Sequence, residues 1–319
     1  MKKLSIFLVL ILAALLLVPA CETDTDEVRL IMVTGGVAGT YFPFGGVMAG
    51  VINENSDNIQ IAANASGASA DNLQQIGAGD AHLAIAQNDV MYYAFTGTSI
   101  WAERDIVTNF GTLMSLYPES VQIVVRADSG IYTVQDIIGR RVSVGDVGSG
   151  VEANTWQVLT AHGITAADIN VVNAPFAASA DLMRDGQLDA FFLTTAAPNT
   201  AVMELSVAHD LRLLSIDNDI QLALMRDYPF YVQVVLDQND YSFLTGPVYT
   251  VAVQATLLAS LDVDEQVAYD IVRILIDYRD EVARGHIRGY DIDINYAVQS
   301  VSVDFHPGAR RFFESRGVL

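Results

Sequence analysis

The chain has 319 residues, 51% of them hydrophobic, and it carries a formal net charge of −21. This length suffices for two domains of ordinary size or for one large α/β domain. The acidity argues against nucleic acid as a partner, because a phosphate backbone is held mainly by basic side chains. Cys21 is the single cysteine, so no disulfide can form within the chain.

The first twenty residues have the pattern of a removable export signal. Lys2 and Lys3 precede an apolar run over residues 4–18, and small residues follow. The segment 18–21 resembles a bacterial lipoprotein cleavage box, so we expect a signal peptide over residues 1–20, lipidation of Cys21 and an acidic tether over residues 21–27. The globular part would then lie outside the cytoplasm, on the periplasmic or cell-surface side. A retained membrane anchor is the alternative, although the apolar run is shorter than the roughly 20 residues that a membrane-spanning helix needs.

The expected mature chain is more acidic than the precursor. No lysine follows Lys3, so fifteen arginines face thirty-eight acidic residues, which gives a net charge near −23. Such a surface repels anions at long range, although it also suits a protein in salty surroundings. A carboxylate ligand would therefore have to be held by local dipoles or by a buried arginine.

Apolar segments of strand-like composition recur along the chain and are separated by helix-like patterns. They cover residues 29–33, 59–63, 83–86, 121–125, 142–144, 169–172, 188–193 and 211–216. This alternation predicts an α/β fold with parallel strands and crossover helices. The longer run over residues 247–260 can pass between two lobes, and from Asp262 the pattern predicts packing helices. Bend signals at residues 116–118 and 245–247 predict the crossings between lobes.

Three turns of small residues each follow a predicted strand and open a predicted helix. They cover residues 34–43, 66–72 and 145–150. A helix that begins in this way presents unpaired N–H groups and the positive end of its dipole, which suits an anion. Ligands of parallel sheets bind at the carboxyl ends of the strands, where all three turns fall. The sequence therefore predicts one polar cleft.

Most enzyme motifs are missing. There is no Gly-Lys-Ser/Thr phosphate loop, and without lysine there is no Schiff base. The glycines of the first turn do not follow the G-x-G-x-x-G order, and Ser149 lacks the spacing of a nucleophile elbow. The five histidines are scattered, so neither a zinc site nor a catalytic triad is predicted. We expect no enzyme, cofactor or metal; an exported enzyme with Asp89 and Asp146 as paired carboxylates is the open alternative.

The remaining polar residues are of the recognition type. Hydroxyls, amides and backbone N–H groups can fix the carboxylate of a zwitterion, while Asp89 or Asp146 can take its ammonium group. Each of them can equally cap a helix or close a turn. The predicted ligand-binding residues are Gly36, Thr40, Tyr41, Ser66, Ser69, Asn72, Gln87, Asp89, Gly148, Ser149, Gly150, Thr194 and Pro198, with Thr195 in the same constellation.

Five sequence motifs follow one another in a characteristic order, at residues 34–43, 66–73, 86–89, 144–150 and 185–199. Together they resemble the TAXI-type extracytoplasmic solute receptors of tripartite ATP-independent periplasmic (TRAP) transporters, from about Val28 to the end of the chain. The resemblance implies a two-lobed type II periplasmic binding protein fold with the ligand cleft between the lobes. Residues 28–118 and 248–319 would form lobe I, and residues 119–247 would form lobe II.

The same resemblance implies a function. The protein would close over a small carboxylate or amino acid, such as glutamate or glutamine, and deliver it to a TRAP-type membrane permease. Asp146 departs from the small or neutral residue expected in its turn and leaves the charge of the ligand open. A lipoprotein that senses a solute and feeds a signalling partner is the alternative.

Overall fold

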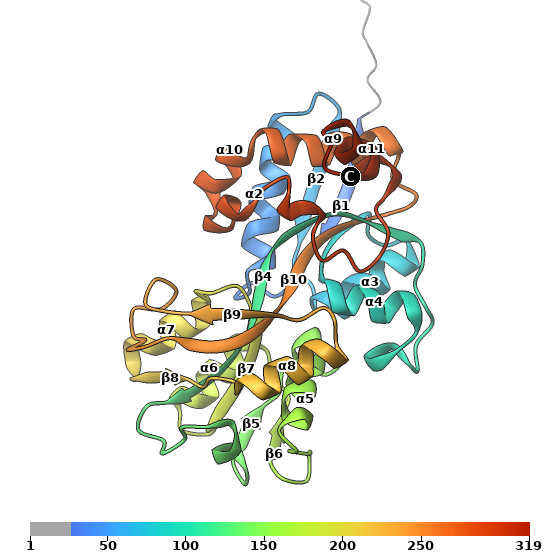
Figure 1. Cartoon of the computed structure of the whole chain (residues 1–319). Helices are drawn as coiled ribbons and strands as arrows, with labels where there is room; N and C mark the ends of the chain where they lie inside the picture. Colours follow the sequence, from blue (N-terminus) through green and yellow to red (C-terminus); the bar gives the residue numbers. More distant parts are fainter. Residues whose placement is uncertain (1–26) are drawn as a thin grey trace, which may run out of the picture.

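The computed structural model describes residues 27–319 and consists of two α/β lobes joined by two long strands (Figure 1). The predicted signal peptide, Cys21 and all of the tether except Glu27 lie outside the described residues. No helix within residues 27–319 is long and apolar enough to cross a membrane.

Lobe I combines the N-terminal third of the chain with its C-terminal helices, which lie together at the top of Figure 1. Its parallel strands are β1 (Val28–Val33), β2 (Ile59–Asn64) and β3 (Leu83–Gln87). Its helices are α2 (Tyr41–Glu54), α3 (Ser69–Ala78), α4 (Asn88–Thr96), α9 (Glu265–Asp277), α10 (Arg279–Gly285) and α11 (Pro307–Ser315).

Lobe II is formed by the middle of the chain. Its strands are β5 (Arg141–Ser143), β6 (Asn170–Val172), β7 (Ala190–Thr195), β8 (Leu211–Leu213) and β9 (Val232–Leu236). Its helices are α5 (Gly150–Ala161), α6 (Phe176–Arg184), α7 (Thr200–Ala208) and α8 (Asn218–Asp227).

Two long antiparallel strands, β4 (Phe110–Arg126) and β10 (Val248–Ser260), connect the lobes in one sheet. The strand order is β2-β1-β3-β10-β4-β7-β5-β6, with β8 on β4 and β9 on β10. The α/β two-lobed fold is therefore confirmed. The parallel expectation holds for β1–β3 and for β5–β7, but it is wrong for β4 and β10, which run antiparallel to their neighbours. The predicted strand at residues 121–125 is only the end of β4, and β9 was not predicted.

The strands that pair with β10 show where this strand passes from lobe II to lobe I. Residues 248–252 pair with β9 of lobe II, whereas residues 255–259 pair with β3 of lobe I. The first predicted crossing, at residues 116–118, lies within β4 opposite this change, since Pro118 is in register with Gln254. The second one, at residues 245–247, precedes β10. The lobe limits remain a proposal, and the pairing favours a second limit inside β10 instead of at its start.

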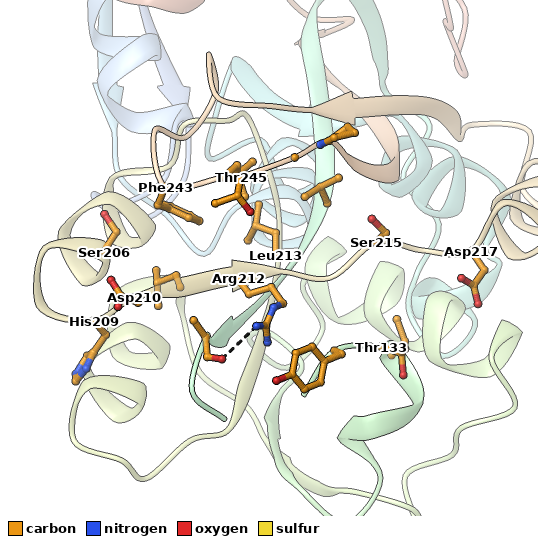
Figure 2. Close-up of a pocket in the computed structure, with 18 of the residues that line it drawn as sticks. Thr133, Ser206, His209, Asp210, Arg212, Leu213, Ser215, Asp217, Phe243 and Thr245 are labelled. Carbon is orange, nitrogen blue, oxygen red and sulfur yellow. Dashed lines mark hydrogen bonds between the residues drawn. The ribbon is translucent and has the colours of Figure 1, made fainter. Parts of the chain in front are cut away.

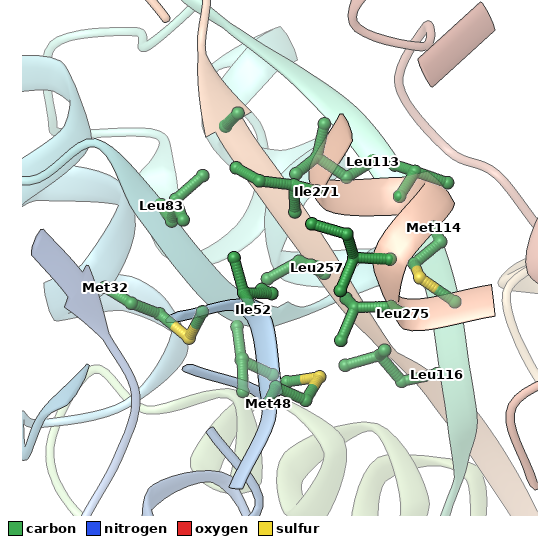
Figure 3. Packing of buried hydrophobic residues seen from close by; sticks show 14 of the residues in the cluster. Met32, Met48, Ile52, Leu83, Leu113, Met114, Leu116, Leu257, Ile271 and Leu275 are labelled. Atoms are coloured by element: carbon green, nitrogen blue, oxygen red, sulfur yellow. The ribbon is translucent and has the colours of Figure 1, made fainter. Parts of the chain in front are cut away.

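Each lobe has its own hydrophobic core, and β4 and β10 contribute to both. In lobe I, Met114 and Leu257 pack with α2 and α9 residues such as Ile52 and Ile271 (Figure 3). In lobe II, the continuations of the same two strands place other side chains in a second cluster, among them Ile123. The face predicted for the helix after Asp262 is buried as expected: it consists of Val267, Ile271, Ile274 and Leu275.

We expect Leu257→Ala to lower the free energy of unfolding by about 2 to 5 kcal/mol, because the truncation leaves a cavity beside a fully buried side chain. Urea unfolding followed by circular dichroism measures the change. Leu261→Ala is the matched control, since Leu261 is 48% exposed. Equal effects of the two substitutions would contradict the packing described here.

Candidate functional site

A cavity of about 360 Å³ lies between the lobes, and all three predicted turns contribute to its wall. Residues of β3, β4 and β7 complete it, together with the start of α6, which the sequence did not predict. The lining residues are Gly35 to Tyr41, Ser66 to Ser69, Gln87, Glu119, Gly145, Asp146, Ser149 to Val151, Ala174 to Ala177, Thr194 and Thr195.

Four helices begin at this cavity, namely α2, α3, α5 and α6, and each has nine residues or more. Among the described residues, the N–H groups of Gly150 and Val151 at the start of α5 have no hydrogen-bond acceptor, and the same holds for Phe176 and Ala177 at the start of α6. Free N–H groups and helix dipoles attract negative charge. The cavity therefore has an anion-binding character that does not need a basic side chain.

The basic and acidic side chains around the cavity are distributed unevenly. No lysine, arginine or histidine is among its lining residues, whereas Glu119 and Asp146 are. Asp146 is largely exposed. The part of its carboxyl group that is buried, together with the nearby Glu152, raises its pKa above the usual value. The buried arginine that the sequence analysis offered as one way to hold a carboxylate is not part of this wall, so helix N-termini are the positive groups present.

Glu119 is the buried acid of the cavity. It lies on β4 with 2% of its surface exposed, and its Oε2 accepts a hydrogen bond of 2.5 Å from the hydroxyl of Tyr41. Burial is the main cause that raises the pKa of Glu119 to about 8, and Asp89 adds to it, while the Tyr41 hydrogen bond acts in the opposite direction. Burial and Glu119 together raise the pKa of Tyr41 well above its usual value, so this hydroxyl keeps its proton.

Polar side chains from both lobes meet across the cavity. The hydroxyls of Thr40 and Thr195 are 3.1 Å apart. The amide of Gln87 packs against Gly150 so closely that a Cβ at Gly150 would lie 1.7 Å from Gln87 Oε1. Gln87 Oε1 and Thr194 Oγ1 are buried and have no hydrogen-bond partner among the described residues. Buried polar atoms of this kind need partners, which a ligand can supply.

Beside the cavity, helix α4 of lobe I is hydrogen-bonded to helix α5 of lobe II. The Asn154 amide donates to Asp89 Oδ2 at 2.8 Å, and the Gln157 amide donates to the hydroxyl of Tyr93 at 2.8 Å. These contacts hold the lobes together in the arrangement of Figure 1.

Nine of the thirteen predicted ligand-binding residues line the cavity. They are Gly36, Thr40, Tyr41, Ser66, Ser69, Gln87, Ser149, Gly150 and Thr194. Ser66, Ser69 and Ser149 also have structural partners, but the capping alternative is confirmed only for Ser149, because α3 has no side-chain cap. Ser149 Oγ accepts from the N–H of Glu152 at the start of α5, Ser69 Oγ accepts from the N–H of Gln87, and Ser66 Oγ donates to Asn72.

The other four predicted residues do not line the cavity. Asn72 is fully buried and donates to the carbonyls of Thr34 and Ile85, so it ties β1 to β3. Asp89 is buried in the contact with α5. Gly148 has a φ of +74°, and a Cβ there would lie 2.5 Å from Arg104 Nη2 instead of blocking a ligand. Pro198 is exposed.

Sequence reasoning missed Glu119 and the start of α6. Glu119 lies in a run of mixed composition before the predicted strand at residues 121–125, and no local motif distinguishes it. Pro175 was the available signal for α6, because proline is favoured where a helix starts. Residues 27–319 contain no group of three His, Cys, Asp or Glu side chains that could hold a metal ion.

A second cavity, of about 680 Å³, lies in lobe II beside β8 (Figure 2). Its arginine, Arg212, donates to the backbone carbonyls of Ile131 and Ala127 and lies over the ring of Tyr132 at 4.3 Å. The guanidinium group of Arg212 is therefore occupied by contacts within lobe II. None of the predicted ligand-binding residues lines this cavity, so its larger volume does not make it the candidate site.

Comparison with known proteins places the chain in a family. A model of the NMT1-like family matches residues 32–317, which is nearly the whole described part. The chain belongs to the NMT1-like family.

Solved structures share the fold of this NMT1-like protein at low sequence identity. The periplasmic aliphatic sulphonate binding protein SsuA from Escherichia coli aligns with a TM-score of 0.52 and 15% identity, over 91% of this chain and 84% of that one. A structure described under glutathione import via GshT and the cystine ABC importer TcyBC of Streptococcus mutans aligns with a TM-score of 0.52 and 11% identity, over 81% and 93%. A putative L-cystine ABC transporter protein from Listeria monocytogenes gives 0.51 and 11%, over 81% and 94%.

The buried Asp89 of this NMT1-like protein predicts a pH-dependent stability. Burial raises the pKa of Asp89 to about 6, so the folded state holds its proton more tightly than the unfolded state. The stability contributed by the protonated form is therefore present below the usual pKa near 4 and is lost as the pH rises through 6. From pH 5 to pH 7 the wild type should therefore lose about 1 kcal/mol of unfolding free energy that Asp89→Asn does not lose.

Urea unfolding of both proteins at pH 5, 6 and 7 tests this expectation. Asp128→Asn is the control, because Asp128 is an exposed partner of Arg126 with a lowered pKa and should show no gain over this range. If the free energies of unfolding of Asp89→Asn and the wild type differ by the same amount at all three pH values, the raised pKa of Asp89 is wrong.

Proposed function

We propose that the protein is an extracytoplasmic solute-binding receptor without catalytic activity. The observation that carries this proposal is the polar cavity between two lobes, into which the N-termini of α2, α3, α5 and α6 open. A ligand that contacts both lobes stabilises the closed arrangement by its differential affinity over the open one. Asp89 does not line the cavity, which removes one of the two carboxylates that the enzyme alternative requires.

The proposed ligand is a small carboxylate or amino acid, similar to glutamate or glutamine. Free helix N-termini in a wall without basic side chains favour a compact anionic group. The structural neighbour SsuA is described as an aliphatic sulphonate binding protein, and a second neighbour is described under glutathione import; sulphonates and glutathione both carry anionic groups. A volume of about 360 Å³ lies at the lower end of the range for small-molecule sites.

The proposed partner is a TRAP-type membrane permease, and the proposed location is the outer side of a membrane with a lipid on Cys21. Both rest on the TAXI-type motifs and on the N-terminal sequence pattern. A signalling partner is the alternative. Uptake by vesicles that contain a TRAP permease, with and without the receptor, would distinguish delivery from sensing.

Calorimetric titration is the first test. The chain from residue 22 onward, unfolded and refolded to remove carried-over ligand, is titrated with amino acids, dicarboxylates and 2-oxo acids. We expect one-to-one binding with a dissociation constant of about 1 μM or below for at least one acid, which is recovered unchanged. The absence of binding across the panel, or chemical conversion of a bound compound, would overturn the receptor proposal.

Ser149→Ala should weaken binding of that acid about tenfold, because one buried hydrogen bond is worth roughly 1 to 1.5 kcal/mol. The same substitution removes the cap of α5 and should cost about 1 kcal/mol of stability. Ser149→Thr keeps a hydroxyl at this position and serves as the control. Unchanged affinity of Ser149→Ala would remove this residue from the site.

A further inference from the structure

We propose that Glu119 and Tyr41 form an ammonium subsite, so the receptor takes amino acids in preference to the corresponding dicarboxylates and 2-oxo acids. This inference rests on the proposed receptor function and narrows its ligand class. It assigns the cationic end of the ligand to Tyr41 of lobe I and to Glu119 at the junction of the lobes, and the anionic end to the helix N-termini of lobe II.

The geometry of Glu119 leaves one of its oxygens available. Tyr41 donates to Oε2, and no hydrogen bond involves Oε1 among the described residues, although the side chain lines the cavity. A carboxylate accepts several hydrogen bonds, and an ammonium group supplies three donors. Gln87 Oε1 and Thr194 Oγ1 line the same cavity as further acceptors without partners. The wall therefore offers vacant acceptors to the donors of an ammonium group.

The charges around Glu119 call for a cation. The groups that interact with it are Tyr41 on α2, Tyr117 on β4, Asp89 on α4 and Tyr296 in the C-terminal segment, and none of them is basic. An ionised carboxylate buried without a counterion is costly, which is why burial raises the pKa of Glu119 to about 8. A ligand ammonium group supplies the missing charge and drives a proton from Glu119.

The helix N-termini of lobe II that line the cavity suit the carboxylate of the same ligand. The unpaired N–H groups of Gly150 and Val151 begin α5, and those of Phe176 and Ala177 begin α6. These groups belong to lobe II, whereas Tyr41 belongs to lobe I and Glu119 lies on the strand that joins both lobes. A zwitterion can therefore contact both lobes with its two charged ends, which links recognition of its charge pattern to closure.

In a second arrangement, the same residues would bind the anionic end of the ligand instead of its cationic end. A neutral Glu119 can donate a hydrogen bond to a ligand carboxylate, and binding would then take up or retain a proton. The two arrangements differ in pH dependence. Affinity for an ammonium ligand rises with pH below the pKa of Glu119, at most about tenfold per pH unit, whereas affinity of a neutral Glu119 for a carboxylate does not.

Matched ligand pairs test the proposal directly. L-glutamate and 2-oxoglutarate, and L-alanine and pyruvate, differ mainly in the ammonium group that a keto oxygen replaces. Calorimetric titration of the refolded chain should show at least one amino acid bound about 100-fold more tightly than its 2-oxo partner. Equal or tighter binding of the 2-oxo acids would overturn the ammonium subsite and leave the receptor proposal intact. Binding of none of the four acids would overturn the subsite, and the wider panel would then decide the receptor proposal.

Variants add a second measurement. Glu119→Gln should reduce the preference for the amino acid at least tenfold and abolish the rise of its affinity between pH 6 and pH 8. Glu204→Gln, at an exposed position of α7, is the matched control and should change neither quantity. If Glu119→Gln fails to fold, titration of the wild type in two buffers of different ionisation enthalpy still decides the question. Proton release on binding supports the subsite, and proton uptake or no proton transfer overturns it.

Discussion

The antiparallel pair of β4 and β10 is the constraint on which the rest of the structure depends. Both strands pass through both lobes, so each hydrophobic core contains side chains from the same two segments. The lobes cannot be rearranged without affecting this shared pairing. Because Glu119 lies on β4 opposite Val253, between the part of β10 that pairs with β9 and the part that pairs with β3, the buried acid of the cavity sits at the junction itself.

In our proposal, recognition in this cavity relies on backbone dipoles, although the protein is strongly acidic. The net charge of −21 repels anions at long range, but this repulsion between exposed charges is screened over about 10 Å at ordinary salt. Helix N-termini act over shorter distances inside the cavity, where solvent screens less. Arginine side chains are instead used on the surface, where most of them pair with a neighbouring carboxylate, such as Arg141 with Asp189.

Two buried carboxyl groups carry different roles because their partners differ. Asp89 accepts hydrogen bonds from Asn154 and from the N–H of Val90, so its oxygens are used in the contact between α4 and α5. Glu119 has only Tyr41 as a described partner and faces the cavity. Burial raises the pKa of both groups. Hydrogen bonds from Asn154 and Val90 offset the cost of burying Asp89. In our proposal, the ligand offsets the cost of burying Glu119.

The sequence by itself determined the α/β class, most strands and the three turns at the cavity, because hydrophobic alternation and glycine-rich helix starts are local properties. Tertiary structure alone decided which polar residues reach the cavity. Asn72 and Asp89 have the same local signal as Ser69 and Gln87, yet their side chains turn into contacts within or between the lobes. Glu119 had no local signal, since only the crossing of β4 between the lobes brings it to the cavity.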